Sequence, residues 1–322
     1  MIRFARLLAL AVVVAVPIGA ASAQDYPSKP VKIIVPFGAG GPADIFSRQL
    51  GQYLSDHLKQ SFVIENRPGA GSIIGTDAVA KSDPDGYTLL AMSNTHTTNE
   101  SLMANKPFEL MKDFVAVSPI NYSDLVMVVH PSVPAKDLKE FIALAKSKPG
   151  QLNYASSGPG TPYHMAGELF KYMSGTDIVH VPHKASGEAR NSVLGGHVQM
   201  MFDAIPTMAP SVQAGQVRAL GTSGAKRSSI MPDVPTIAEA GVPGYESTIW
   251  LGLMAPKGTP AAIVNKLNAA MQEAMKQPAV QEAWAKQGAA PMFMSPAEFD
   301  AMLRKDIEKW AQVVKTANIK PQ

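Results

Sequence analysis

Cysteine is absent from this 322-residue chain. Its absence excludes disulfides, thiol nucleophiles and metal sites built on cysteine, and an exported chain of this length can be stable on its core alone. Three catalytic patterns are also missing: the G-x-S-x-G nucleophile elbow, the H-E-x-x-H zinc helix and the G-x-x-x-x-G-K-[ST] phosphate loop. These absences argue against hydrolase chemistry.

A strong charge of either sign is absent as well. The chain has 29 Lys and Arg against 26 Asp and Glu, a formal net charge of +3. Without Arg3 and Arg6, which belong to the leader segment described next, the balance becomes 27 − 26 = +1. The sequence therefore gives no reason to expect a nucleic-acid partner.

The N-terminal 23 residues have the pattern of a secretory signal. Arg3 and Arg6 precede an apolar run from Leu7 to Val16, and Ala21-Ser-Ala23 provides a small-residue cleavage site before Gln24. The apolar run is too short for a membrane-spanning helix, although a transmembrane anchor is the alternative interpretation. Because the leader has no twin-arginine pair, we expect Sec-type export of an unfolded chain and a periplasmic mature protein.

The mature chain has 322 − 23 = 299 residues, which is large for one core and suits two lobes. Strand-like and helix-like runs alternate in two series, which predicts an α/β fold with mostly parallel sheets. The strands expected are Val31–Val35, Phe62–Glu65, Tyr87–Met92, Leu125–Val129, Leu152–Tyr154, Asp177–Val181, His197–Phe202, Val217–Leu220 and Ile249–Met254. The chain is expected to cross between the lobes twice, near Ile120–Ser123 and near Glu246–Trp250. We therefore expect lobe 1 to comprise residues 24–122 and 248–322, and lobe 2 residues 123–247.

The first glycine-rich corner predicts an anion site. Gly38, Gly40 and Gly41 follow the first strand, Pro42 suits the first position of a helix, and Asp44 complements the positive end of the helix dipole. Backbone N–H groups from Gly40 to Asp44 should then lie open to a carboxylate or phosphate.

The same letters permit a dinucleotide site. Gly38-Ala-Gly40-Gly-Pro-Ala43 fits G-x-G-x-x-G/A, and Glu65 ends the next strand at the distance of a ribose-binding acid. An exported oxidoreductase would have to find its cofactor outside the cytoplasm, which disfavours this alternative.

Two further polar segments follow strands. Ser93-Asn-Thr-His-Thr-Thr-Asn99 should form a polar loop at the carboxyl edge of the sheet, where open α/β sheets bind ligands. The other is a second glycine-rich corner, Ala155-Ser-Ser-Gly-Pro-Gly-Thr161, which follows the strand Leu152–Tyr154. Its last residue, Thr161, is expected to cap the helix that Pro162 begins. His164 is expected to donate a hydrogen bond at this binding loop, and a metal site made from His164, Glu168, His180 and His183 is not favoured, because zinc needs three or four converging ligands.

Taken in order, several motifs resemble those of the Bug family, the periplasmic substrate-binding proteins of tripartite tricarboxylate transporters. The motifs are Pro36-Phe-Gly-Ala-Gly-Gly-Pro-Ala-Asp44, Glu65-Asn-Arg-Pro-Gly-Ala-Gly71, Pro84-Asp-Gly-Tyr-Thr-Leu89, Tyr154-Ala-Ser-Ser-Gly158, Lys226-Arg227 and Pro232-Asp-Val-Pro-Thr236. The resemblance implies a type II periplasmic-binding fold, in which two α/β lobes joined by two crossover strands close on a small organic carboxylate, without a cofactor, metal or enzymatic activity. It also implies membrane permease subunits as partners, and we expect a monomer.

The resemblance also implies ligand-binding positions on both lobes, with ordered waters helping to hold the carboxylate. These positions are Phe37, Gly40, Gly41, Ala43, Asp44, Ser93, Asn94, Thr95, His96, Ser156, Ser157, Gly158, Thr161, His164 and Asp203. Two departures leave the ligand's identity open: Ala43 stands where members often carry Thr or Ser, and His183-Lys184 where Tyr-Lys is common. The ligand could be citrate-like, a C4 to C6 dicarboxylate, an acidic amino acid or an aromatic acid such as a phthalate.

No arginine or lysine is fixed by motif in either corner. We therefore expect neutral donors and water to hold the ligand. A ligand with two carboxylates would be held one per lobe, with Ser156, Ser157 and Thr161 serving the second lobe.

Overall fold

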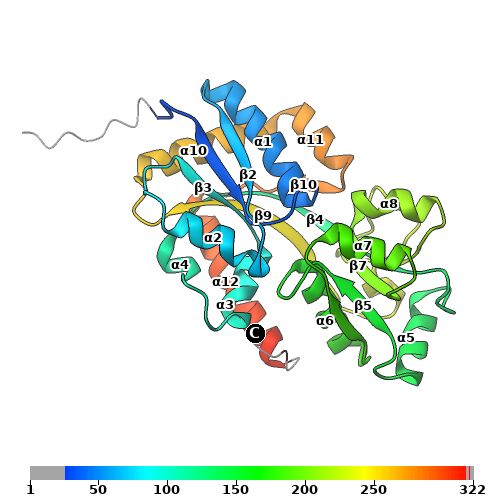
Figure 1. The fold of residues 1–322 in the computed structure, drawn as a ribbon. Helices are drawn as coiled ribbons and strands as arrows, with labels where there is room; N and C mark the ends of the chain where they lie inside the picture. The colour runs from blue at the N-terminus through cyan, green and yellow to red at the C-terminus, as the bar shows by residue number, and fades with distance from the viewer. Residues whose placement is uncertain (1–25, 317–318, 320–322) are drawn as a thin grey trace, which may run out of the picture.

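The structure, a computed structural model, describes residues 26–316 and 319. The predicted signal segment, residues 1–23, lies outside this range. Two sheets, each with helices against it, form two lobes that lie side by side in Figure 1.

Lobe 1 is built on a mixed sheet in the order β2-β1-β3-β9-β4, with β10 added along β4. Strands β1 (Val31–Val35), β2 (Phe62–Asn66) and β3 (Thr88–Ser93) are parallel, whereas β9 (Thr248–Pro256) runs antiparallel to both β3 and β4 (Phe114–Val129). The helices of this lobe and the last strand are α1 (Pro42–Leu58), α2 (Ile73–Ala80), α3 (Asn94–Leu102), α4 (Leu110–Asp113), α10 (Ala261–Lys276), α11 (Pro278–Ala285), β10 (Ala289–Pro291) and α12 (Pro296–Thr316).

Lobe 2 is coloured green in Figure 1 and is built on the order β4-β7-β5-β6, with β8 on the other side of β4. Strands β5 and β7 are parallel neighbours, so their carboxyl ends lie at one edge of the sheet. The elements of this lobe are α5 (Leu138–Ser147), β5 (Asn153–Ser156), α6 (Pro162–Ser174), β6 (Val179–Pro182), α7 (Ser186–Leu194), β7 (Met200–Ala204), α8 (Ile205–Gln213), β8 (Arg218–Thr222) and α9 (Ile237–Ala240).

One long strand belongs to both sheets. Along β4, Phe114 to Asp124 pair with β9 of lobe 1, and Leu125 to Val129 pair with β7 and β8 of lobe 2. The change of partner thus falls directly after the Ile120–Ser123 segment expected to cross between the lobes. The second connection enters lobe 1 at β9, which begins at Thr248.

The apolar runs of the sequence become the core. The strand residues Ile33, Val128 and Phe202 are fully buried, and so is Phe299 on α12. Gly252 in β9 allows this packing, because a Cβ there would lie 2.3 Å from the Phe299 ring.

Three details of the sequence-based expectation are wrong. Ser93–Asn99 is not a loop: Ser93 ends β3 and the rest forms the first turns of α3, since the Ser93 side chain caps that helix. Strands β6 and β7 begin later than expected, at Val179 and Met200, and α8 was not expected at all. Pro206 in the first turn of α8 and Pro210 inside it obscure its helical pattern.

Candidate functional site

The β1–α1 corner keeps only part of its backbone open. Gly41 is the N-cap residue of α1, Pro42 is its first residue, and Gly40 has a φ of +77°. The Asp44 carboxylate accepts a 2.9 Å hydrogen bond from the Gly40 amide and forms a 2.8 Å ion pair with Arg48; burial opposes ionisation, but these interactions together lower the pKa of Asp44. The expectation of an open Gly40 amide is therefore wrong. Within the described part of the chain, the Gly41 and Ala43 amides have no acceptor.

At the start of α3, His96 has a structural role. Its Nδ1 accepts a 3.2 Å hydrogen bond from the Ser93 amide, and Ser93 Oγ accepts one from the Thr95 amide, which completes a capping box. Its Nε2 donates to Thr76 Oγ1 at 3.0 Å, because the Thr76 hydroxyl hydrogen is directed to the Ser72 carbonyl. Phe37 packs edge-on against the same ring, with centroids 5.8 Å apart. Burial lowers the pKa of His96 to about 4, so the ring is neutral at pH 7.

The same helix start carries polar atoms that have no partner in the described structure. Asn94 donates to the Thr248 carbonyl, but its Oδ1 accepts nothing, and Thr95 Oγ1 has no hydrogen-bond partner at all. Both residues are buried. A buried hydroxyl without a partner costs about 1–3 kcal/mol, so a bound ligand or ordered water would relieve this cost. These atoms and the open amides of the β1–α1 corner mark lobe 1 as one side of a candidate binding site.

In lobe 2, two hydroxyl groups of the β5–α6 corner, those of Ser156 and Thr161, are already engaged. Ser156 Oγ lies 2.6 Å from His180 Nε2 and also contacts the amide and carbonyl of Gly158. Thr161 occupies the N-cap position of α6 as predicted, but its hydroxyl donates to the Gly158 carbonyl at 2.7 Å and does not cap the helix. Ser157 is half-buried beside them. The corner is thus held by its own side chains.

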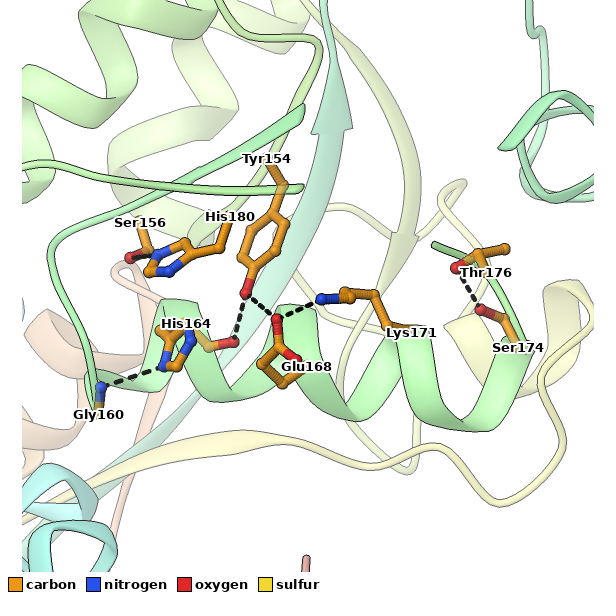
Figure 2. A network of polar contacts seen from close by, with 9 residues as sticks. All are labelled: Tyr154, Ser156, Gly160, His164, Glu168, Lys171, Ser174, Thr176 and His180. Carbon is orange, nitrogen blue, oxygen red and sulfur yellow. Dashed lines mark hydrogen bonds and ion pairs between the residues drawn. The ribbon is translucent and has the colours of Figure 1, made fainter. Parts of the chain in front are cut away.

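Two imidazoles, the buried His164 and the half-buried His180, pack against this corner (Figure 2). The rings of His164 and His180 lie 4.1 Å apart, and Tyr154 stacks on His180 with centroids 4.9 Å apart. His164 Nδ1 accepts a 3.1 Å hydrogen bond from the Gly160 amide, so the prediction that this side chain donates to the loop is wrong at this contact. Burial lowers the pKa of His164 to about 4 and that of His180 to about 3.

The possible metal ligands in this region have other partners. The Glu168 carboxylate accepts from the Tyr154 hydroxyl at 2.6 Å and pairs with Lys171 at 2.8 Å (Figure 2). Across the residues that the structure describes, no three His, Asp or Glu side chains converge as a metal site.

At the end of β7, Asp203 forms an ion pair that the sequence did not predict. Its Oδ2 lies 2.6 Å from Arg190 Nε, and its Oδ1 accepts the Ala204 amide at 2.8 Å. The Asp203 side chain is 0% exposed and that of Arg190 22%. Burial raises the pKa of Asp203, and the charge of Arg190 opposes this rise. Arg190 was missed because it stands in the middle of α7, outside every motif.

The two corners meet where the lobes touch. A Cβ placed on Gly38 would lie 3.8 Å from Ala185 Cβ, and one on Gly41 would lie 3.9 Å from Ser186 Oγ, so the β1–α1 corner faces the start of α7. A Cβ on Gly160 would lie 2.5 Å from Asn99 Oδ1 of α3. The lobes therefore contact each other along a seam between the β1–α1 corner and the start of α7, and between α3 and the β5–α6 corner.

An apolar cluster also crosses the seam. Leu102 of α3 and Met165 of α6 pack together with Trp310 and Val314 of α12. Two surface hollows of about 500 and 320 Å³ lie elsewhere, along α12 and beside the start of β4, and contain none of the predicted site residues. The candidate site therefore rests on the contacts at the seam and on the unpartnered polar atoms of lobe 1, and neither hollow is part of it.

Two lobes that share a long strand and close on polar corners define a solute receptor of the periplasmic-binding type. The chain belongs to the tripartite tricarboxylate transporter receptor family, whose model matches residues 46–319. It is 39% identical to Protein BugT of Bordetella pertussis over 93% of this chain and 92% of that protein. The family identifies a receptor rather than an enzyme.

Solved structures agree with this assignment. The R. palustris protein Rpa4515, solved with adipate, has a TM-score of 0.88 and 35% identity over 92% of this chain and all of that one. MatC from Rhodopseudomonas palustris, with bound malate, has a TM-score of 0.84 and 32% identity over 90% of this chain and all of that one. The dinucleotide alternative gains no support from Glu65, the acid expected to bind ribose. Its carboxylate pairs instead with Arg67 and with Lys32.

Proposed function

We propose that this protein captures a small organic carboxylate between its lobes and delivers it to the membrane permease of a tripartite tricarboxylate transporter. The observation that carries the proposal is the set of unpartnered polar atoms on lobe 1, Asn94 Oδ1 and Thr95 Oγ1, buried at the start of α3. Thr95 offers a hydroxyl hydrogen to an anion, and Asn94 Oδ1 can accept from a bound water. Adipate and malate in the two related structures support a carboxylate as the ligand.

The proposal includes residue boundaries and a location. We propose lobe 1 as residues 24–122 and 248–322 and lobe 2 as 123–247, which agrees with the change of partner along β4. The first 23 residues would be removed on export to the periplasm, where the mature chain would act as a monomer. No helix in the described part of the chain is long and apolar enough to cross a membrane. Sequencing the N-terminus of the mature protein should give Gln24.

The proposed binding residues are those predicted from the sequence, with different roles. Gly41, Ala43 and Thr95 would donate to the ligand directly, whereas His96, Ser156 and His164 would hold the corners in shape. Asp44 and Asp203 would orient the neighbouring arginines and amides.

Calorimetry tests this function directly. Adipate, malate, citrate, glutamate and phthalate would each be titrated into the mature protein, with butanediol and hexanediol as uncharged controls. We expect at least one acid to bind and both diols to fail, and solution scattering should show a smaller radius at saturation, since ligand contacts with both lobes favour closure. A protein that binds none of these acids, or whose radius is unchanged at full occupancy, would contradict the proposal.

A further inference from the structure

The pair formed by Arg190 and Asp203 lies at the ligand-binding edge of lobe 2. Strands β5 and β7 are in parallel register, with Tyr154 opposite Met200 and Ala155 opposite Met201. Two residues further along, Ser157 is level with Asp203, so the ion pair begins where the β5–α6 corner begins. Carboxyl ends of parallel strands are where such sheets bind their ligands.

Arg190 also lies on the side of α7 that faces the other lobe. Ser186, the first residue of α7, is the one that approaches Gly41 of the β1–α1 corner. Residues four apart lie on the same face of a helix, one turn from each other. Arg190 is thus one turn along α7 from the contact with lobe 1, and its side chain retains 22% of its exposure.

The guanidinium is only partly used. Asp203 engages the Nε–H, and among the hydrogen bonds of the described residues none is made by either Nη. An arginine whose two Nη groups remain available can bind a carboxylate as a planar fork. Asp203 accepts from both Arg190 and the Ala204 amide, so its carboxylate is satisfied and serves to orient the arginine.

Two hydroxyls of this corner are already committed to other partners. The hydroxyl hydrogen of Thr161 is directed to the Gly158 carbonyl. The hydroxyl of Ser156 is held between His180 and Gly158. Both hydroxyls are therefore committed within lobe 2. A second anionic group arriving there would meet the Ser157 hydroxyl as a neutral donor and Arg190 as a charged one.

Resting on the proposed function, we propose that Arg190 binds a second carboxylate of the ligand, with Asp203 as its positioning residue. The ligand is accordingly a diacid or triacid with one carboxylate held at the lobe 1 corners and another directed at α7. An ammonium group at that end would face the guanidinium charge, so acids with a terminal amine are disfavoured. The sequence predicted that neutral donors of lobe 2 bind the second carboxylate. In this proposal the Arg190 guanidinium binds it instead.

The first experiment uses the unaltered protein. Calorimetry with succinate, glutarate, adipate and suberate identifies the best diacid length, after which that acid is compared with the monoacid and the ω-amino acid of equal chain length. We expect the diacid to bind roughly 10- to 100-fold more tightly than either, the usual scale for a charged hydrogen bond. Equal binding of the diacid and the ω-amino acid overturns the role of Arg190 while leaving carboxylate capture intact. If no acid binds at all, it is the proposed function that fails.

The second experiment changes the arginine. Arg190→Gln should remove the preference for the diacid, with monoacid binding unchanged within about threefold. Because a lone buried aspartate can unfold the lobe, the double variant Arg190→Gln/Asp203→Asn keeps a neutral pair at the same place. Arg227→Gln is the matched control, since Arg227 also donates its Nε to a carboxylate of lobe 2, Glu239, but on the exposed surface. An undiminished diacid preference in either Arg190 variant, or equal losses for diacid and monoacid, overturns the proposal.

Discussion

The two lobes use the same local design at the seam, a strand followed by a glycine-rich corner, a proline and a helix, but their polar groups are in opposite states. On lobe 1, Thr95 Oγ1 and Asn94 Oδ1 are buried without partners. On lobe 2, Ser156 is bonded to His180 of β6 and Thr161 to Gly158 of its own corner. A buried polar group without a partner favours binding of a ligand that can hydrogen-bond to it. A polar group that already has a partner instead stabilises the conformation of its own loop. We therefore expect lobe 1 to receive the ligand first and lobe 2 to close over it with little rearrangement of its own corner.

The comparison predicts unequal sensitivity to acid, the largest effect expected. His164 and His180 belong to lobe 2, and His96 to lobe 1; burial lowers their pKa values to about 4, 3 and 4. Unfolded histidines titrate near 6.5, so the unfolded chain binds more protons below that pH. Stability should be fully present above pH 6.5 and fall as the pH drops toward 4, by up to about 1.4 kcal/mol per pH unit for each histidine.

Urea denaturation between pH 7.5 and 4.5 measures this fall, and hydrogen exchange locates it. Lobe 2 should lose protection first, because it contains two of the three residues. His164→Asn should flatten the slope of stability against pH, whereas His57→Asn, on the exposed end of α1, should not. Equal loss of protection in both lobes would contradict the comparison.

The second-largest effect is expected in the free energy of unfolding, when the Asp203–Arg190 pair of lobe 2 is compared with the Asp44–Arg48 pair of lobe 1. Asp203→Asn leaves Arg190 with an uncompensated charge in a buried site and should cost about 3 kcal/mol of unfolding free energy. Asp44→Asn affects an arginine that is 51% exposed and keeps the amide contact, so about 1 kcal/mol is expected. Urea denaturation of both variants at pH 7 gives the two values. Equal costs would show that the two pairs are equivalent.

Closure itself can be tested at Gly160. Its φ is +71° and a Cβ would meet Asn99 Oδ1 of lobe 1, so Gly160→Ala should weaken ligand binding at least tenfold by hindering closure. Gly215→Ala is the matched control, because Gly215 has a φ of +70° but open space around its Cβ position. Both variants place a Cβ on a residue with left-handed backbone and lose stability for that reason. Only the Gly160 variant also brings its Cβ against a residue of the other lobe. Calorimetry with the best-binding acid measures the difference, and equal affinities would show that the seam tolerates the methyl group.

The smallest effect compares two threonines. Thr95→Val removes an unpartnered hydroxyl and should leave the ligand-free protein equally stable or slightly more stable, whereas Thr161→Val loses the bond to Gly158 and should cost about 1 kcal/mol. Ligand binding should respond in the reverse order, with the larger loss for Thr95→Val. Thermal unfolding with and without ligand gives both quantities. The same order in both measurements would remove the distinction between the lobes.

Much of the fold was readable from the sequence, since period-2 and period-3.6 apolar patterns depend on local burial. The strand Val31–Val35 and the crossing between the lobes near Ser123 were expected from such patterns and agree with β1 and with the change of partner along β4. Segments whose pattern is polar were misread: α3 looked like a loop because its residues Asn94 to Asn99 are all polar, yet tertiary packing buries them. The motifs predicted where the corners lie.

The partners within the site could not be predicted from spacing. His180 and Arg190 reach the corner from β6 and α7, and nothing in their sequence neighbourhood specifies Ser156 or Asp203 as partners. The sequence also does not predict whether a given hydroxyl has a hydrogen-bond partner. Thr95 and Thr161 have the same side chain, and only their surroundings leave the first without a partner and give the second one. Such pairings arise from the three-dimensional packing of elements far apart in the chain.

The position of β9 has a consequence for how the chain assembles. In the lobe 1 sheet, β9 lies between β3 and β4, although it is made long after both. Until Thr248–Pro256 has been synthesised, β3 and β4 each present an unpaired edge, whereas β5, β6, β7 and β8 have all their neighbours. Lobe 2 can therefore fold while the chain is still emerging, and lobe 1 must wait for its last third. We therefore expect lobe 2, the middle of the chain, to fold before lobe 1. The lobe 1 sheet, which contains the first strands of the chain, becomes complete only when β9 pairs with β3 and β4.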